Sequence, residues 1–493
     1  MNDIRTTYSY DDYLLVPQYS EVKSRKDINI GNWLDEDRGL WFNLPIISSP
    51  MDTITEEKMA VTIAKRGGLG IIHRYNSVER QVEMAELIFE NVSPSLVGFA
   101  IGVSGDYLDR AKQLVQAGAK ILCVDVAHGN HILMKNAIAA LRKTLGETPH
   151  IMAGNVATLD GANNLASWGA NSVRVGIGGG SICFVAGTLV RTENGLKKIE
   201  EIEIGDKVYT HLGRLRSVLD TLSFERDEEI ISINGIECTK THEFYTLDRE
   251  DIDMVSDETL HSLARWVPAK DLDRANHVLV KLNSGVLKKF APFSPEEIIT
   301  IEYKHYKGMS YDLTVQTDHS YNVDGIIVHN CSTRIQTGHG VPSLDSVIDC
   351  SSTEFNVAII ADGGIKNSGD IAKALAGCAD FAMIGSIFAG SDCTPGNVMT
   401  DNNGNRRKVY RGMASESAQM DWRGKAASLE GISTTVPYKG PTTEIIDQLD
   451  NGIRSAFSYS GARTIGEFWS KSRLIRQSAS SAKESGTHIL SRD

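Results

Sequence analysis

Two cysteines stand at the ends of a segment whose neighbouring residues could carry out chemistry on the backbone. Cys183 follows a glycine-rich turn and leads into an apolar run, in the sequence GGGSICFVAGTLV at 178–190. Cys331 directly follows His329 and Asn330 in VHNCSTRIQ at 328–336. A thiol beside a peptide carbonyl can attack that carbonyl to form a thioester, and the same acyl group can then pass to a second thiol. The two fragments look like halves of one loop, GIGGGSI joined to CSTRIQTGHGVP.

Short β-branched runs recur on both sides of this interrupted loop. They are PIISSPMD (45–52), LGIIHR (69–74), LVGFAIG (96–102), ILCVDVAHG (121–129), HIMAGNV (150–156), SVRVGIGGG (172–180), VAIIADGG (357–364) and FAMIGS (381–386). Nearly continuous apolar runs are typical of strands that a parallel sheet buries on both faces. Amphipathic stretches, such as 55–66 and 106–118, lie between the runs. Eight strand–helix alternations predict an α/β fold, a (β/α)8 TIM barrel.

The spacing of the runs defines the domain organisation. The sixth and seventh runs start at 172 and 357, and removing the 148 residues 183–330 shortens that distance from 185 to 37. The removed piece alternates short β runs with ENG, NG and DG turns, which are hairpin signals. We therefore expect strands 1–6 of the barrel in residues 1–182 and an all-β insert in residues 183–330. Residues 331–493 should hold the Cys331 loop, strands 7–8, a flap and a tail.

Composition limits the classes of function. The chain has 493 residues, a formal net charge of −12 and 41% hydrophobic residues, without an apolar run of membrane-spanning length. Its N-terminal residues lack the apolar core of a signal peptide, so we expect a cytoplasmic protein without a membrane partner. The acidic balance argues against nucleic-acid binding. The seven cysteines include no C-x-x-C pair, which argues against a zinc ribbon.

The insert resembles an intein of the hedgehog/intein type. The resemblance rests on Cys183 with the following FVAGTLVRTENGLKKIEEIEIGDKV, on TKTH at 239–242, and on YDLTVQTDHSYNVDGIIVHN at 311–330. The residues between the two β blocks, 247–297, are too few for a homing endonuclease, so the insert is similar to a mini-intein. The alternative is a β-rich regulatory insertion whose Cys, His and Asn residues are incidental.

This resemblance implies autocatalytic splicing with specific roles. Cys183 would attack the Ile182 carbonyl, and Cys331 would then take over the acyl group. Asn330 would cyclise and cut its own peptide bond. The assisting residues implied are Thr239 and His242 for the first step, Asp312 and His319 for the transfer, and His329 with His319 as proton donors for the last step.

The rejoined barrel resembles the IMP dehydrogenase/GMP reductase family. The motifs are SSPMDTITE (48–56), GGLGIIHR (67–74), VDVAHG (124–129), AGNVAT (153–158), GIGGGSI–CSTR, ADGGIKNSGDIAKALAGCADFAMIGSIFAG (361–390), YRGMAS (410–415) and EGI…VPYKGP (430–441). One departure is Gly179, where the family usually has proline. Independently of the resemblance, glycine turns after the seventh and eighth strands suit phosphate, because their backbone N–H groups can approach its oxygens.

The family resemblance implies a purine mononucleotide, GMP or IMP, as substrate and a nicotinamide dinucleotide, NADPH or NAD, as cofactor. It implies Cys331 as nucleophile at purine C2 and Thr333 with Glu430 as proton-transfer groups. The implied substrate ligands are Ser181, Asn155, Asp362, Gly364, Gly385, Ser386, Tyr410, Gly412 and Met413, with Asp125 on the cofactor side. Carbonyls of Gly178, Gly180 and Cys331 match a monovalent-cation site, which would take K⁺. A homotetramer after splicing is also implied.

Two reactions remain open within this family, and we favour GMP reductase over IMP dehydrogenase. The stretch between Met413 and Glu430 is short and lacks the Arg-Tyr pair that activates water in the dehydrogenases. The paired regulatory module usual in dehydrogenases is absent between IIHR and LVGFAIG. Against this, SSPMDTITE and GGLGIIHR are closer to the dehydrogenase form. A third hypothesis is that the unspliced chain is only a precursor without purine activity.

Overall fold

The computed structural model describes residues 7–177, 184–239, 242–256, 259–282, 293–316, 318, 320–329, 340–400, 406–411, 413 and 433–477. For residues 220, 222–229, 262, 268, 314, 329, 433 and 434 it describes the backbone alone. The described residues form two compact units, one within Met1–Gly179 and His339–Ala482 and the other within Gly180–Gly338. Each unit is described by itself.

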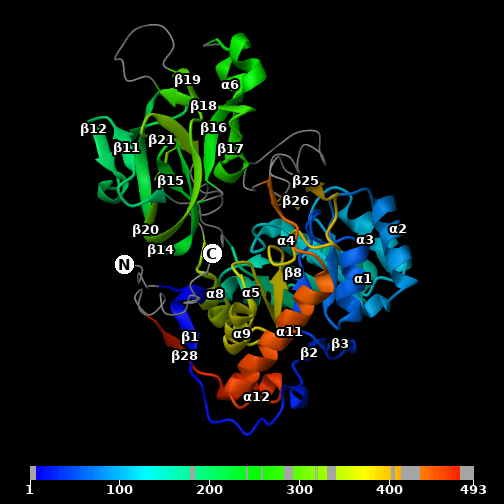
Figure 1. The fold of residues 1–493 in the computed structure, drawn as a ribbon. Coiled ribbons are helices and arrows are strands. Elements are labelled where there is room, and N and C mark those ends of the chain that lie inside the picture. Colours follow the sequence, from blue (N-terminus) through cyan, green and yellow to red (C-terminus); the bar gives the residue numbers. More distant parts are fainter. Residues whose placement is uncertain are drawn as a thin grey trace. The chain divides into compact units, whose positions relative to one another are not determined.

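The first unit is a closed barrel of eight parallel strands (Figure 1). In chain order the strands are β4 (Ile46–Ser48), β5 (Leu69–Ile72), β6 (Val97–Ile101), β7 (Ile121–Asp125), β8 (His150–Val156), β9 (Ser172–Val175), β23 (Ala358–Asp362) and β24 (Phe381–Ile384). Each strand pairs with the next, β9 pairs with β23, and β24 pairs with β4 to close the ring. The sequence runs thus predict all eight strands.

Helices alternate with these strands around the barrel. They are α1 (Glu57–Lys65), α2 (Val78–Phe89), α3 (Tyr107–Gln116), α4 (Ile132–Leu145), α5 (Leu159–Ser167), α8 (Ser343–Ser351), α9 (Ser368–Ala376), α11 (Thr442–Tyr459) and α12 (Ile465–Lys471). Side-chain caps fix where some of them begin: Thr158 accepts from the backbone N–H of Gly161, and Asn367 accepts from that of Asp370. The pattern confirms the (β/α)8 fold class.

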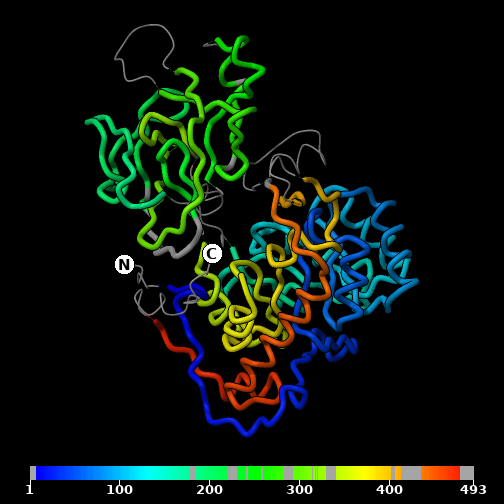
Figure 2. The backbone as a smooth tube through the Cα atoms, viewed as in Figure 1, coloured from blue at the N-terminus to red at the C-terminus, as the bar shows by residue number. Residues whose placement is uncertain are grey.

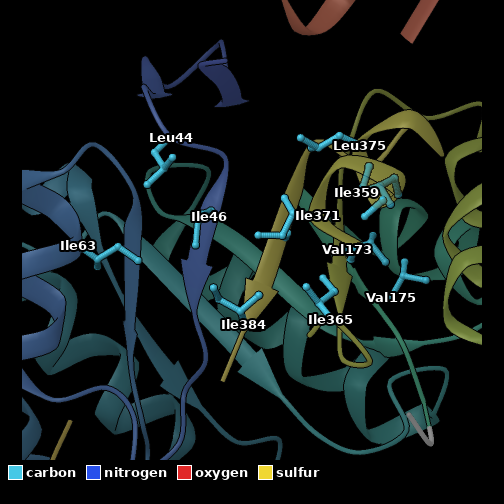
Figure 3. Packing of buried hydrophobic residues seen from close by; sticks show 14 of the residues in the cluster. Leu44, Ile46, Ile63, Val173, Val175, Ile359, Ile365, Ile371, Leu375 and Ile384 are labelled. Carbon is cyan, nitrogen blue, oxygen red and sulfur yellow. The ribbon is translucent and has the colours of Figure 1, made fainter. Parts of the chain in front are cut away.

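Two apolar layers hold the barrel together, because successive strand residues face opposite sides of the sheet. Side chains such as Val173, Ile359 and Ile384 face outward and pack against the helices. Figure 3 shows part of this layer, where strand residues lie together with Ile371 of α9. The inner layer contains residues such as Met152, and Phe42 of the hairpin β2 (Asn32–Asp35) and β3 (Leu40–Phe42) packs with that layer. The hairpin therefore joins the barrel's inner core.

Two further β pairings frame the barrel. Strand β1 (Tyr13–Leu15) pairs with β28 (Leu474–Arg476), so the blue and red ends of the tube in Figure 2 run side by side. Strands β25 (Met399–Thr400), β26 (Arg406–Arg411) and β27 (Ser433–Pro437) form an antiparallel sheet after strand β24. This sheet carries Tyr410 and Arg411.

The second unit is built from antiparallel β-strands (Figure 1). Its strands are β10 (Phe184–Val185), β11 (Leu189–Thr192), β12 (Gly195–Lys198), β13 (Lys207–Tyr209), β14 (Leu215–Ile233), β15 (Ile236–Cys238), β16 (Glu243–Asp248), β17 (Arg265–Pro268), β18 (His277–Leu282), β19 (Phe293–Glu297), β20 (Ile301–Val315), β21 (Ser320–Val323) and β22 (Ile326–His329). One short helix, α6 (Leu260–Leu263), lies between β16 and β17. The β-rich composition of the insert is therefore confirmed. None of the helices described in either unit is long and apolar enough to cross a membrane.

Candidate active site

The alternation of side chains along three barrel strands brings charged groups to the inner side at the carboxyl ends. On β9, Val173 and Val175 belong to the outer layer, so Arg174 between them points inward. By the same alternation Asp125 on β7 and Asp362 on β23 occupy inward positions. The site therefore follows from strand periodicity.

Arg174 joins the two carboxylates. Its Nη2 and Nε lie 2.8 and 3.1 Å from Asp362 Oδ2, and its Nη1 lies 2.6 Å from Asp125 Oδ1. The guanidinium is almost completely buried, with 6% of its side chain exposed. Burial alone would lower the pKa of Arg174, but the carboxylate charges of Asp362 and Asp125 hold it well above its usual value. Arg174 is therefore a fixed cation between Asp362 and Asp125, the residues predicted to face the substrate and the cofactor.

Asn155, at the end of β8, adds an amide to the same cluster. Its Nδ2 donates to Asp362 Oδ2 at 2.9 Å and to the Gly176 carbonyl at 2.8 Å. Both N–H groups of the amide are thereby used within the barrel. A carboxamide oxygen has two lone pairs, so Oδ1 of the oriented amide can accept a hydrogen bond from a bound molecule.

The turn after β23 needs glycine for two separate reasons. Gly363 and Gly364 have φ of +94° and +78°, a left-handed conformation that other residues rarely adopt. A Cβ on Gly364 would also lie 2.8 Å from Ser343 Oγ. Both positions of this turn therefore exclude larger residues, and its role in holding a phosphate remains a prediction.

The turn after β24 is held by hydrogen bonds from a lysine. Lys439 Nζ donates to the carbonyls of Ser386 and Ile387, at 3.0 Å each. A Cβ on Gly385 would lie 3.1 Å from Met51 Sδ. The structure thus places Gly364, Gly385 and Ser386 at the ends of neighbouring strands, β23 and β24, which pair in register.

Arg411 and Met413 contact the segment that follows strand β4. Arg411 forms an ion pair with Asp52, with Nη2–Oδ2 at 2.6 Å, and its backbone N–H donates to Thr53 Oγ1 at 3.1 Å. The backbone N–H of Asp52 lies 3.2 Å from Met413 Sδ. Burial and the charge of Asp362 raise the pKa of the Tyr410 hydroxyl, so Tyr410 lies within electrostatic range of the same cluster.

Several predicted residues lie outside the described part of the chain. They are Gly178, Gly180, Ser181, Cys183, His319, Asn330, Cys331, Thr333, Gly412 and Glu430, and the side chain of His329 belongs with them. Their roles remain predictions. The residues brought together are Asp125, Asn155, Asp362, Gly364, Gly385, Ser386, Tyr410 and Met413, all within the barrel unit. Among the described residues, no cluster of three or more His, Cys, Asp or Glu side chains could hold a metal ion.

In the insert, three predicted splicing residues surround the first described residue of the unit. Phe184 pairs in antiparallel register with Cys238 and Tyr311, which immediately precede Thr239 and Asp312. The ring of His242 lies 3.9 Å from the ring of Phe184, centroid to centroid. His242 is fully buried, and its backbone N–H donates to the Thr239 carbonyl at 3.0 Å. His242 of the TKTH motif thus lies beside Phe184, the first described residue of the insert.

The last strand of the insert reaches the same place. Val328 on β22 pairs with Phe244 on β16 and with Tyr321 on β21. The Tyr321 ring lies 6.0 Å from Phe184, and its hydroxyl donates to Asp312 Oδ1 at 2.6 Å. The two ends of the insert therefore converge on one cluster.

Sequence reasoning missed Arg174 and Tyr321. The signal for Arg174 was present, because an arginine inside the apolar run SVRV requires a buried anionic partner. Its partners are 49 and 188 residues away along the chain, so no local pattern identifies them. Tyr321 carries no such signal, because a tyrosine in a strand is ordinary.

Comparisons with known proteins agree with both units. Residues 7–199 and 327–488 match the model of the IMP dehydrogenase / GMP reductase domain, and residues 182–234 match the Hint domain. A GMP reductase of Leishmania major is 28% identical, over 98% of this chain and 97% of the relative. Inosine-5′-monophosphate dehydrogenases of Methanocaldococcus jannaschii and Aquifex aeolicus are 29% and 30% identical, over 99% and 98% of this chain and 96% of each relative.

The fold and the strand-end cluster define a (β/α)8-barrel oxidoreductase of purine nucleotides, interrupted after its sixth strand by an intein-type β domain. More narrowly, the chain belongs to the IMP dehydrogenase/GMP reductase family. Relatives of both names match it to a similar degree, so the family is established and the direction of the reaction is a separate question.

Proposed function

We propose that this chain removes residues 183–330 autocatalytically and that the joined barrel is a GMP reductase. The observation that carries the catalytic half is the Asp125–Arg174–Asp362–Asn155 cluster at the ends of β7, β9, β23 and β8. It lies on the barrel unit that also holds the two glycine turns suited to a phosphate. Barrel enzymes carry their active sites at this end of the strands.

In the proposed reaction the substrate phosphate binds at the turns carrying Gly364, Gly385 and Ser386, with Ser181 and Tyr410. Asp362 accepts from the ribose hydroxyls, while Asn155 and Arg174 keep its carboxylate in place. The backbone around Gly412 and Met413 reads the purine edge. Asp125 keeps 17% of its side chain exposed, so it can accept from a cofactor ribose hydroxyl while paired with Arg174.

Cys331 would attack C2 of GMP as a thiolate, and the amino group would leave as ammonia after protonation through Thr333 and Glu430. NADPH supplies the hydride that C2 accepts. The carbon–sulfur bond then breaks, the electron pair returns to sulfur, and IMP is released. The carbonyls of Gly178, Gly180 and Cys331 could hold K⁺ during this cycle, and homotetramers and a cytoplasmic location are part of the same proposal.

The structure supports reductase over dehydrogenase at one point. Between the end of β5 at Ile72 and the start of β6 at Val97, every residue is described, and the segment contains helix α2 and one 3₁₀ turn. No regulatory module is inserted in this described segment. IMP dehydrogenase, forming XMP from IMP, NAD and water, is the second candidate because SSPMDTITE and GGLGIIHR are closer to its form.

The test of the catalytic proposal follows the nicotinamide absorbance of the purified protein. Loss of absorbance with GMP and NADPH is expected. Gain of absorbance with IMP and NAD instead would assign the dehydrogenase reaction and refute the weight given to the missing Arg-Tyr pair.

For splicing, the convergence of Phe184 and Val328 on His242, Tyr321 and Asp312 is the supporting geometry. Cys183 would form a thioester with Ile182, Cys331 would take over the acyl group, and cyclisation of Asn330 would release the insert. His242, with Thr239, would protonate the departing nitrogen in the first step, and His319 and His329 would assist the last. An S-to-N shift then joins Ile182 to Cys331.

Intact mass tests this sequence of steps directly. The wild-type chain should yield a 345-residue product and a 148-residue fragment, which together account for the 493 residues. A chain carrying Cys183→Ala and Asn330→Ala should stay at full length. His242→Ala should accumulate uncleaved precursor. An unchanged rate of excision in that variant would remove His242 from the mechanism.

A further inference from the structure

Tyr10 is a buried tyrosine beside the phosphate turn that the family motifs did not single out. It lies in a short 3₁₀ turn, Tyr10–Asp12, and is 2% exposed. Its hydroxyl is buried and has no hydrogen-bond partner among the described residues. Buried hydroxyl groups are nearly always hydrogen-bonded in folded proteins, so an exception requires an explanation.

The position of Tyr10 indicates what the missing partner is. Its ring atom Cε2 lies 3.5 Å from the position a Cβ would take on Gly364, the glycine of the proposed phosphate turn. Burial raises the pKa of the Tyr10 hydroxyl, and the charges of Asp370, near the start of α9, and of Asp362, at the end of β23, add to this effect. The phenol therefore keeps its proton and can act as a donor at the edge of the site.

The backbone of Tyr10 is fixed, so its side chain has little freedom to seek another partner. Lys373 Nζ donates to the Tyr10 carbonyl at 2.9 Å. The backbone N–H of Ser9 donates to Asp12 Oδ2 at 2.7 Å, within a reciprocal capping box. The next strand, β1, is paired with β28. The backbone that carries the Tyr10 side chain is therefore held on three sides.

We propose that the Tyr10 hydroxyl donates a hydrogen bond to the phosphate of the bound purine mononucleotide, as an additional ligand supplied by the N-terminal segment. The inference rests on the proposed function only in so far as a nucleotide binds; it holds equally for GMP and for IMP. The anion would gain a neutral donor opposite the Gly363–Gly364 backbone, with the Lys373 ammonium as a nearby positive charge.

Tyr13 provides a matched control three residues along the chain. Its hydroxyl is satisfied, because it donates to Asp345 Oδ1 at 2.8 Å. Tyr10→Phe and Tyr13→Phe therefore remove the same atom, from an unpartnered and from a partnered tyrosine. Both rings remain in the same core.

The experiment measures dissociation constants for IMP, GMP and inosine, by direct titration and by competition. It also measures the midpoint of thermal unfolding of each protein without ligand. Each chain is expressed at full length and its purified form recorded by intact mass. Tyr10→Phe should weaken IMP and GMP binding about tenfold and leave inosine binding unchanged, because a hydrogen bond to a charged group is lost. Its unliganded midpoint should equal or exceed that of the wild type. Tyr13→Phe should lower the midpoint and leave the ratio of IMP to inosine affinity unchanged.

Wild-type affinity for IMP and GMP in Tyr10→Phe would overturn the inference and leave the hydroxyl to a buried water. An equal loss of inosine affinity would also overturn it, since the effect would not be specific to phosphate. Failure of the wild type to bind any of the three molecules would instead refute the proposed function itself.

Discussion

Replacing Arg174 by methionine should destabilise the barrel strongly, because it leaves two carboxylates without their shared cation. The guanidinium makes three close contacts to Asp125 and Asp362, at 2.6, 2.8 and 3.1 Å. The side chains of Asp125 and Asp362 are only 17% and 12% exposed. Removing one partner of a buried ion pair costs about 3–5 kcal/mol, and partial exposure of the carboxylates points to the lower end.

Urea unfolding followed by circular dichroism is the appropriate assay. With an m-value on the order of 3 kcal/mol/M, a loss of about 3 kcal/mol lowers the midpoint by about 1 M. The background should carry Cys183→Ala and Asn330→Ala, so that both units are present. A transition of the insert then serves as an internal control, and it should not move, because Arg174 contacts barrel residues.

A double-mutant cycle identifies the cause of the loss. Asp362→Asn in the Arg174→Met background should recover part of the stability, with a coupling energy of at least about 1 kcal/mol. Additive effects of the two substitutions would refute the ion-pair reasoning and assign the loss to packing alone. A shift in midpoint below about 0.3 M would show that the cluster is far more hydrated than its burial indicates.

Three further predictions follow from other residues. Gly364→Ala should lower the free energy of unfolding by about 1–2 kcal/mol and weaken nucleotide binding, because the added Cβ meets Ser343 Oγ at 2.8 Å. Gly363→Ala is the control, since Gly363 also has a positive φ but its added Cβ meets no atom within 4 Å. An equal loss of binding in both variants would contradict the steric argument. Burial lowers the pKa of His150 below its usual 6.5, although Asp35 hydrogen-bonds to it, so protonation favours the unfolded chain and barrel stability should fall as the pH drops below about 6.5. His150→Gln should flatten that slope in thermal midpoints between pH 8 and pH 5.5, and an unchanged slope would assign it to another group. Burial would raise the pKa of Asp318, but hydrogen bonds from Arg214 and Thr210 hold it at about 2, below its usual 3.8. Its stabilisation is fully present above about pH 4 and is lost as the pH falls through about 2. Asp318→Asn should therefore cost the insert about 2 kcal/mol at pH 7 and much less at pH 2; a full deficit that persists at pH 2 would argue for a steric effect.

The fold was largely predictable from sequence because each barrel strand is buried on both faces and reads as an apolar run. The bounds of the strands were less predictable. The run PIISSPMD predicts a longer strand, but β4 covers only Ile46–Ser48. The strand ends there because Pro50 has no N–H to donate to a neighbouring strand. The glycine turn at 363–364 was predictable because its positive φ angles exclude most other residues.

The charge arrangement within the site was not predictable in the same way. Asp125 was expected on the cofactor side, and the structure adds an ion pair with Arg174 that no spacing rule indicates. The same holds for Phe184 and His242, whose ring centroids lie 3.9 Å apart although the residues are 58 apart in sequence (242 − 184 = 58). Such pairs depend on which strands become neighbours, and that is decided by topology rather than by local pattern.

Two strand pairings hold the two pieces of the barrel together independently of the chain connection between them. Residues 7–177 supply β4 to β9 and residues 340–477 supply β23 and β24, and the two pieces meet at β9–β23, at β24–β4 and again at β1–β28. All three contacts are hydrogen-bonded and none depends on a peptide bond between the pieces. The two pieces of the barrel are thus complementary fragments, like the halves of a split protein that reassemble without a covalent link. If both junctions were cut without being joined, the two fragments would keep these complementary strand edges, and we expect them to reassociate.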